Sequence, residues 1–73
     1  MLVPCLDLLA TASVGESWRW DLRIDSLGLF RWYLDGSIET NLCATTMSQA
    51  KSALRGFVER TLCGELTITE VAD

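Results

Sequence analysis

The chain of 73 residues contains no histidine, a single proline and no pair of cysteines with the spacing Cys-x-x-Cys. Without an imidazole there is no histidine general base and no Ser-His or Cys-His nucleophile pair. The sequence also has no glycine-rich phosphate-binding loop. We therefore expect a protein that is not an enzyme, with no catalytic residue, no cofactor-binding residue and no bound cofactor.

The cysteines Cys5, Cys43 and Cys63 are odd in number and lie far apart in the sequence. A structural zinc site needs four ligands, usually from cysteine and histidine, and this chain does not offer them with a suitable spacing. We expect no metal site. Three reduced thiols in a cytosolic protein are the simplest interpretation, and a single disulfide bridge is the alternative.

The N-terminal segment 2–12 has some features of a targeting signal, because it is apolar and ends in Ala10-Thr11-Ala12. However, no lysine or arginine precedes the apolar run, and Asp7 interrupts it. The run is also too short to span a membrane. We expect a cytoplasmic protein that does not contact a membrane.

Acidic residues outnumber basic residues by ten to six, which gives a net charge of −4. Such a surface repels nucleic-acid phosphates and anionic lipids, and it favours a partner with a basic surface. Apolar residues make up 49 % of the chain, a surplus that points to a further buried surface against a partner or a second copy. Alternatively, the three tryptophans simply form the core.

Strict alternation of apolar and charged residues over positions 18–25 predicts a half-buried strand. Its apolar face carries Trp18, Trp20, Leu22 and Ile24, and its charged face carries Arg19, Asp21, Arg23 and Asp25. The next residues, Ser26-Leu27-Gly28, predict a three-residue hairpin loop in which Gly28 has a positive φ. This loop would place apolar residues opposite each other in the pairs Ile24–Phe30, Leu22–Trp32 and Trp20–Leu34.

The dipeptide Asp35-Gly36 predicts a second hairpin, and its register has two solutions. A two-residue turn would place Trp32 opposite Glu39. A three-residue loop gives the pairs Leu34–Ile38, Trp32–Thr40 and Phe30–Leu42. We favour the three-residue loop, because burial usually fixes the register, and it predicts a third strand at about 38–43.

A helix is predicted to begin after Thr46, which forms a capping box with Gln49. Apolar residues then recur at spacings of three and four, and this stripe consists of Met47, Ala50, Leu54, Phe57, Val58 and Leu62. Gly64 is placed to end the helix in a left-handed conformation. Gly56, inside the helix, predicts close packing on the sheet.

Two further strands complete the prediction. Segment 65–71 is rich in β-branched residues that alternate with others, and segment 8–14 favours an added strand, with a helix starting near Pro4 as the alternative. The chain is thus predicted to be a single α+β domain over residues 1–73. It would contain an antiparallel sheet of three to five strands, with one amphipathic helix at about 46–63 packed on the apolar face that begins at Trp18.

The charged side of the predicted sheet is the candidate site. Arginine and tyrosine are enriched at protein interfaces, and the large groups of Leu29 and Tyr33 on this side need a cover. A solvated face of mixed charge is the alternative interpretation. The candidate partner-binding residues are Arg19, Arg23, Leu29, Arg31, Tyr33 and Asp35.

The order of strands and helix from Trp18 to Leu62, with Ala50-Lys51 early in the helix, resembles the last elements of a double-stranded-RNA-binding domain. Where that family has phosphate-binding lysines, this chain has Met47-Ser48-Gln49. The Trp-x-Trp-x-Leu strand, the glycine turn and the alanine-bearing helix also resemble a small bacterial ββα family of unknown function, whose repeat is duplicated.

In its size, acidity and aromatic-rich sheet, the chain is similar in kind to phage or mobile-element proteins that inhibit bacterial defence complexes, such as anti-CRISPR proteins. This resemblance of profile implies a non-enzymatic inhibitor that works by occupying a protein partner. One alternative is a small RNA- or DNA-binding module that uses the outer face of the sheet. The other is a homo-oligomeric structural protein.

Overall fold

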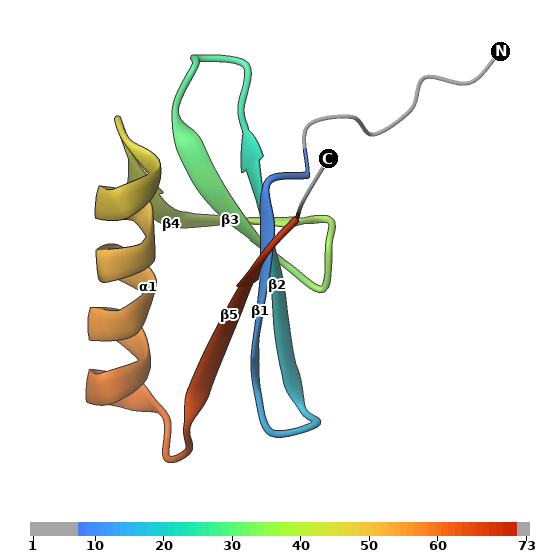
Figure 1. The fold of residues 1–73 in the computed structure, drawn as a ribbon, viewed down its shortest axis with the longest axis vertical. Helices are drawn as coiled ribbons and strands as arrows, with labels where there is room; N and C mark the ends of the chain where they lie inside the picture. The colour runs from blue at the N-terminus through green and yellow to red at the C-terminus, as the bar shows by residue number, and fades with distance from the viewer. Residues whose placement is uncertain (1–7, 72–73) are drawn as a thin grey trace, which may run out of the picture.

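The structure is a computed structural model that describes residues 8–71, and it consists of a five-stranded antiparallel sheet and one helix (Figure 1). The elements are β1 (Ala10–Val14), β2 (Trp18–Ile24), β3 (Phe30–Leu34), β4 (Ile38–Ala44), α1 (Met47–Thr61) and β5 (Leu66–Glu70). The strand order is β4-β3-β2-β1-β5, so β4 and β5 form the two edges. This architecture confirms the predicted α+β class.

Both terminal strand predictions are confirmed where the structure describes them. The segment predicted at 8–14 forms β1, and the segment predicted at 65–71 forms β5, which pairs antiparallel with β1. The predictions for Pro4, Cys5 and Asp7 lie outside the described residues. Within residues 8–71, no helix has the length and apolar character needed to cross a membrane.

The β2–β3 hairpin has the predicted register. Its cross-strand pairs include Ile24–Phe30, Leu22–Trp32 and Trp20–Leu34. Asp25 and Leu29 close the loop, since the Asp25 amide donates to the Leu29 carbonyl at 2.8 Å. Gly28 has a φ of 83°, a left-handed conformation that glycine adopts without a steric penalty. Turn chemistry and burial therefore specify the same register here.

The β3–β4 hairpin follows the prediction at its turn and departs from it farther along. Leu34 pairs with Ile38, as the three-residue loop requires, and Asp35 and Gly36 both have positive φ, at 55° and 83°. At the other end, however, Phe30 pairs with Ala44, so the predicted pair Phe30–Leu42 is wrong. The ladder shifts between Arg31 and Tyr33, where β4 contains extra residues.

Thr40 explains this shift. Its hydroxyl donates to the Trp32 carbonyl at 2.6 Å, and its own carbonyl accepts from Arg31 Nη1 at 2.6 Å. These side-chain bonds replace regular ladder bonds and stabilise a bulge in β4. The shift is an even number of residues, and side chains along a strand alternate between the two faces of the sheet. The apolar residues of β4 therefore still face α1.

The core lies between α1 and one face of the sheet. Its fully or nearly buried residues are Ala10, Ala12, Val14, Trp20, Leu22, Trp32, Ala50, Leu54 and Val58. Trp20 is packed by Trp18, whose ring is stacked at 6.0 Å, and by Phe57, whose ring meets it edge-on at 6.5 Å. The two ends of the predicted apolar face are not covered, since Trp18 is 38 % and Ile24 is 43 % exposed.

A hydrogen bond from the sheet to the helix crosses this core. The Trp32 side chain is fully buried, and its Nε1 donates to the Ala50 carbonyl at 2.8 Å. A buried indole N–H without a partner would be costly, so this bond fixes where the first turns of α1 lie on β3. Ala50 is itself fully buried, and its small side chain allows the helix backbone to approach the indole.

The N-terminus of α1 confirms half of the predicted capping box. The Thr46 hydroxyl accepts from the Gln49 amide at 3.1 Å, as expected for an N-cap. The Gln49 side chain, however, does not complete the box by reaching back to the Thr46 amide. Its Oε1 instead accepts from the Thr45 hydroxyl at 3.1 Å, so a second threonine takes part in the cap.

Two glycine predictions are wrong. Gly64 does not cap α1, because the C-cap is Leu62 in an extended conformation. Gly64 instead has a φ of 150°, and a Cβ there would lie 2.7 Å from the Val14 side chain, so it allows the chain to pass close to β1 as it enters β5. Gly56 does not contact the sheet, since a Cβ there would meet the Arg60 guanidinium at 3.1 Å.

Replacing Trp32 by phenylalanine should lower the free energy of unfolding by about 1 kcal/mol more than replacing Trp20 by phenylalanine. Both changes remove the same atoms from a buried indole, but only Trp32→Phe deletes the N–H that binds Ala50. Urea unfolding of the parent and the two variants, followed by circular dichroism, measures the difference. Equal losses in the two variants would show that the hydrogen bond adds nothing to packing.

Candidate partner-binding face

The surface of the sheet that points away from α1, called the outer face, is built from the residues that alternate with the core. Its central rows are Arg23 beside Arg31, and Asp21 between Thr11 and Tyr33. Arg19 lies beside Ser13 and next to the β3–β4 turn. The structure therefore brings four of the predicted residues, Arg19, Arg23, Arg31 and Tyr33, onto one surface.

The two remaining predicted residues lie at opposite ends of this surface. Leu29 is half-buried and follows the β2–β3 loop, where its amide donates to the Asp25 carboxylate at 2.9 Å. Asp35 is exposed in the β3–β4 turn, and its amide donates to the Arg19 carbonyl at 2.8 Å. Leu29 is thus separated from the group formed by Arg19 and Asp35, because the whole length of β3 lies between the two turns.

Asp25 is the most highly connected carboxylate of the described chain. Its Oδ1 accepts from the Leu27 and Leu29 amides at 2.8 and 2.9 Å, and its Oδ2 accepts from Arg31 Nε at 2.9 Å. Only 4 % of the side chain is exposed. The Leu29 amide, with Arg31 and the Leu27 amide, lowers the pKa of Asp25 below its ordinary 3.8, although burial acts in the opposite direction.

Arg31 is held mainly by groups of its own chain. Besides Asp25 it contacts the Thr40 carbonyl through Nη1 at 2.6 Å and Glu39 Oε2 through Nε at 3.6 Å. The hydrogen bond to Asp25 is the main cause that raises the pKa of Arg31. Its side chain is 14 % exposed, so Arg31 links the two hairpins and leaves little of its surface to a partner.

Arg23 and Tyr33 form the middle of the outer face. The Arg23 guanidinium lies over the Tyr33 ring, 5.8 Å from its centroid, and its Nη2 is 3.4 Å from Asp21 Oδ2. The Arg23 Nε is buried and has no hydrogen-bond partner among residues 8–71. The Arg23 side chain is therefore held by two attractive contacts, the ion pair with Asp21 and the cation–π contact with Tyr33.

A pocket of about 170 Å³ opens beside this group and is lined by Arg19, Asp21, Asp35 and Gly36. It is several times larger than the volume of about 30 Å³ that one water molecule occupies. Gly36 keeps it open, since a Cβ there would lie 3.2 Å from Asp21 Oδ2 and the φ of 83° disfavours other residues. Two carboxylates and one guanidinium suit the cationic side chain and a neighbouring carbonyl of a protein partner.

Asp21 and Gly36 were not predicted as site residues. Asp21 belongs to the charged set of β2, but only the folding of the β3–β4 turn against β2 brings Gly36 next to it. The hydrogen bond between the Asp35 amide and the Arg19 carbonyl holds the turn against β2, and these two residues are far apart in the sequence. Local sequence therefore carries no signal for the contact.

Neither a metal-binding cluster nor a comparison with known proteins assigns further residues to the outer face. Within residues 8–71, no group of three or more cysteine or acidic residues is arranged to hold a metal ion. Cys43 is half-buried and Cys63 is exposed, and both are free thiols in the part of the chain described. The chain matches no protein-family model, no curated protein and no solved structure. The candidate site therefore depends on geometry alone.

Replacing Asp25 by asparagine should remove a part of the stability that depends on pH. Because folding lowers the pKa of Asp25, its charged form stabilises the fold above pH 3.8, and this stabilisation is lost as the pH falls through the folded-state pKa. The difference in free energy of unfolding between parent and Asp25→Asn should be constant near neutral pH and shrink toward about pH 2.

Urea unfolding over this pH range measures that difference, and Glu16→Gln is the matched control. Glu16 is exposed in the β1–β2 turn, and it has no hydrogen bond or ion pair within the described segment. The control removes one negative charge without touching the network of Asp25. A difference for Asp25→Asn that stays constant down to the lowest pH would contradict the role assigned to the ionised carboxylate.

Proposed function

We propose that this protein is a non-enzymatic binding protein that acts by docking another protein on the outer face of its sheet. The observation that carries the proposal is the pocket of Arg19, Asp21, Asp35 and Gly36, which lies at the end of that face beside Arg23 and Tyr33. Interfaces are enriched in arginine and tyrosine, and small pockets are where the anchoring side chains of a partner insert.

The charges of the outer face favour a protein over a nucleic acid. Two of its arginines are compensated within the chain, Arg23 by Asp21 and Arg31 by Asp25. The pocket itself contains two carboxylates and one guanidinium, so it attracts a cation rather than a phosphate. Alternating signs give orientation and specificity to a protein complex, with little long-range attraction. A partner with a basic, exposed side chain fits this arrangement.

The biological role that we propose is the inhibition of a larger complex in the bacterial cytoplasm, in the manner of phage-encoded anti-CRISPR-like proteins. A chain of 73 residues with a net charge of −4 can block a basic surface by occupying it, without any chemical step. This assignment rests on the similarity in size, charge and composition, together with the mixed-charge pocket.

The proposal predicts that a pair of substitutions in the pocket weakens partner binding and that a matched pair on the helix does not. Arg19→Ala with Asp35→Asn removes one charge of each sign from the pocket, and Asp35 needs asparagine because its φ is 55°. Arg55→Ala with Glu59→Gln removes the same charges from α1, where both residues are exposed. Partner affinity should fall at least about tenfold for the pocket pair and less than about twofold for the helix pair.

The measurement begins with affinity capture from the native host and identification of the bound protein by mass spectrometry. Titration calorimetry with that purified protein then compares the parent and both variants, after circular dichroism has shown that all three are folded. A partner that loses affinity only for the helix pair would place the binding surface on α1 and contradict the proposal.

A further prediction separates a protein partner from a nucleic acid. At about 100 mM salt the protein should not be retained on an immobilised single-stranded or double-stranded oligonucleotide, because a net charge of −4 and the carboxylates among its arginines oppose phosphate. The elution position on a column measures this directly. Retention that falls steeply as salt rises would favour the RNA- or DNA-binding alternative for the outer face.

A further inference from the structure

Strand β5 forms an open edge of the sheet. It pairs with β1 on one side, where the Val71 amide donates to the Leu9 carbonyl at 3.0 Å. Backbone N–H and C=O groups alternate in direction along an antiparallel strand, so the backbone groups of Thr67 and Thr69 are also directed toward β1. The N–H and C=O groups of Leu66, Ile68 and Glu70 point the other way, and they have no hydrogen-bond partner among residues 8–71.

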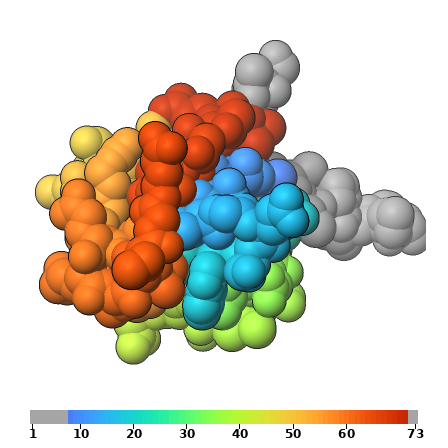
Figure 2. All heavy atoms as spheres, turned by 90° about the horizontal axis from the view of Figure 1, so that it is seen from below, coloured from blue at the N-terminus to red at the C-terminus, as the bar shows by residue number. Residues whose placement is uncertain are grey.

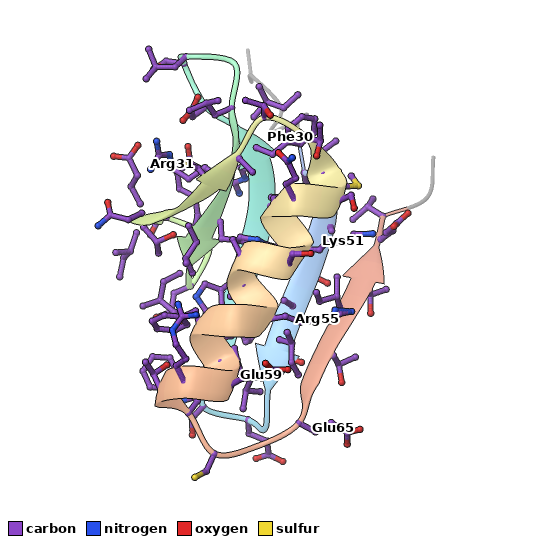
Figure 3. All side chains as sticks on the ribbon, turned by 90° about the vertical axis from the view of Figure 1, so that its left-hand side faces the viewer. Phe30, Arg31, Lys51, Arg55, Glu59 and Glu65 are labelled. Atoms are coloured by element: carbon purple, nitrogen blue, oxygen red, sulfur yellow. The ribbon has the colours of Figure 1, made fainter. Side chains whose placement is uncertain are left out.

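The figures show that this edge is accessible. β5 is the strand nearest the viewer in Figure 1, with no other element in front of it. It lies at the far right of Figure 3, where no ribbon lies beyond it. Viewed from below, the C-terminal strand (orange to red) lies at the surface next to β1 (blue) (Figure 2).

The two edges of the sheet differ in how far they resist pairing. Natural edge strands avoid association through bulges, charges and prolines. β4 has such protection, since it contains a bulge. The side chains of Thr40 and Arg31 donate hydrogen bonds to backbone carbonyls around this bulge. β5 has the sequence LTITE, with no proline, no register shift in its pairing with β1 and three consecutive β-branched residues.

We propose that β5 pairs antiparallel with β5 of a second copy of this chain, about a two-fold axis at Ile68. The strand is complementary to itself in this register, as a symmetric dimer requires. Ile68 lies opposite Ile68 of the second copy, and Thr67 lies opposite Thr69, a favourable cross-strand pair. The backbone groups of Leu66, Ile68 and Glu70 all gain hydrogen bonds, and the half-buried side chains of Leu66 and Ile68 become more fully covered.

Charge disfavours one alternative register. A two-fold axis at Glu70 would place the two Glu70 side chains opposite each other, and like charges at that distance are destabilising. With the axis at Ile68, each Glu70 lies opposite Leu66 instead. Glu70 also forms an ion pair with Lys51 of its own helix, which lies on the side of α1 that faces β5 (Figure 3).

The dimer would have a functional consequence. Pairing through β5 continues the sheet from one copy into the next, so both outer faces lie on the same side of the assembly. Two pockets on one surface can bind a partner that presents two sites, and the second contact then benefits from a high effective concentration. The self-pairing of β5 stands independently of the partner-binding proposal, since no residue of the outer-face pocket takes part in it.

A pair of substitutions at Glu70 tests the hydrogen bonds of the edge. Glu70→Pro removes the outward-pointing N–H, and a proline is tolerated on an edge strand. Glu70→Ala is the matched control, because it keeps that N–H while losing the same ion pair with Lys51. Sedimentation equilibrium from about 1 µM to about 1 mM protein measures the dimer dissociation constant. The parent and Glu70→Ala should form a species of twice the 8.1 kDa chain mass.

The dissociation constant of Glu70→Pro should be at least about tenfold higher than that of Glu70→Ala. Hydrogen exchange of the parent should show slower exchange of the Leu66 and Ile68 amides at high than at low concentration. A parent that stays monomeric overturns the proposal, as does a dimer to which Glu70→Pro and Glu70→Ala are equivalent. A monomer in which these amides are already protected would show that another part of the chain covers the edge, and it overturns the proposal equally.

Discussion

The buried hydrogen bond between the Trp32 indole and the Ala50 carbonyl connects the middle of the sheet to the first turns of α1. Apart from the ion pair between Lys51 and Glu70 near the β5 edge, α1 contacts the sheet mainly through apolar packing, which fixes distance but tolerates sliding. The indole N–H has one direction, and it must find an acceptor in a site without water. It therefore sets the position of α1 along β3, and the C-terminal end of the helix then determines where Gly64 and β5 meet β1.

On the other side of the sheet, the Asp25 carboxylate has a comparable role. It closes the β2–β3 loop through two backbone amides and holds Arg31, which in turn binds the Thr40 carbonyl in the bulge of β4. One chain of charge-assisted bonds thus connects three strands. The arginine that sequence patterning placed at the centre of a binding face is therefore mainly a structural residue, and the accessible charges of the outer face are concentrated around the β3–β4 turn.

The two surfaces that we propose for association differ in character. The outer face ends in a small pocket of mixed charge, which we propose as the binding site for the side chains of a partner protein. The β5 edge offers backbone groups and β-branched side chains, which are suited to a strand of the same sequence. The surplus of apolar residues in the composition is in part visible on the surface. Trp18, Ile24 and Ile38 are exposed at strand ends, and Leu27 is exposed in the β2–β3 loop.

The sequence by itself determined the features that depend on local periodicity and turn chemistry. The alternation from Trp18, the register around Gly28, the N-cap at Thr46 and the helical stripe through Leu54 each follow from neighbours within a few positions. Only the tertiary structure decided the bulge at Thr40, the contact of Gly64 with Val14, the pocket beside Gly36 and the edge position of β5. These features arise where segments far apart in the chain compete for the same hydrogen bonds and space, and no local pattern records the outcome of that competition.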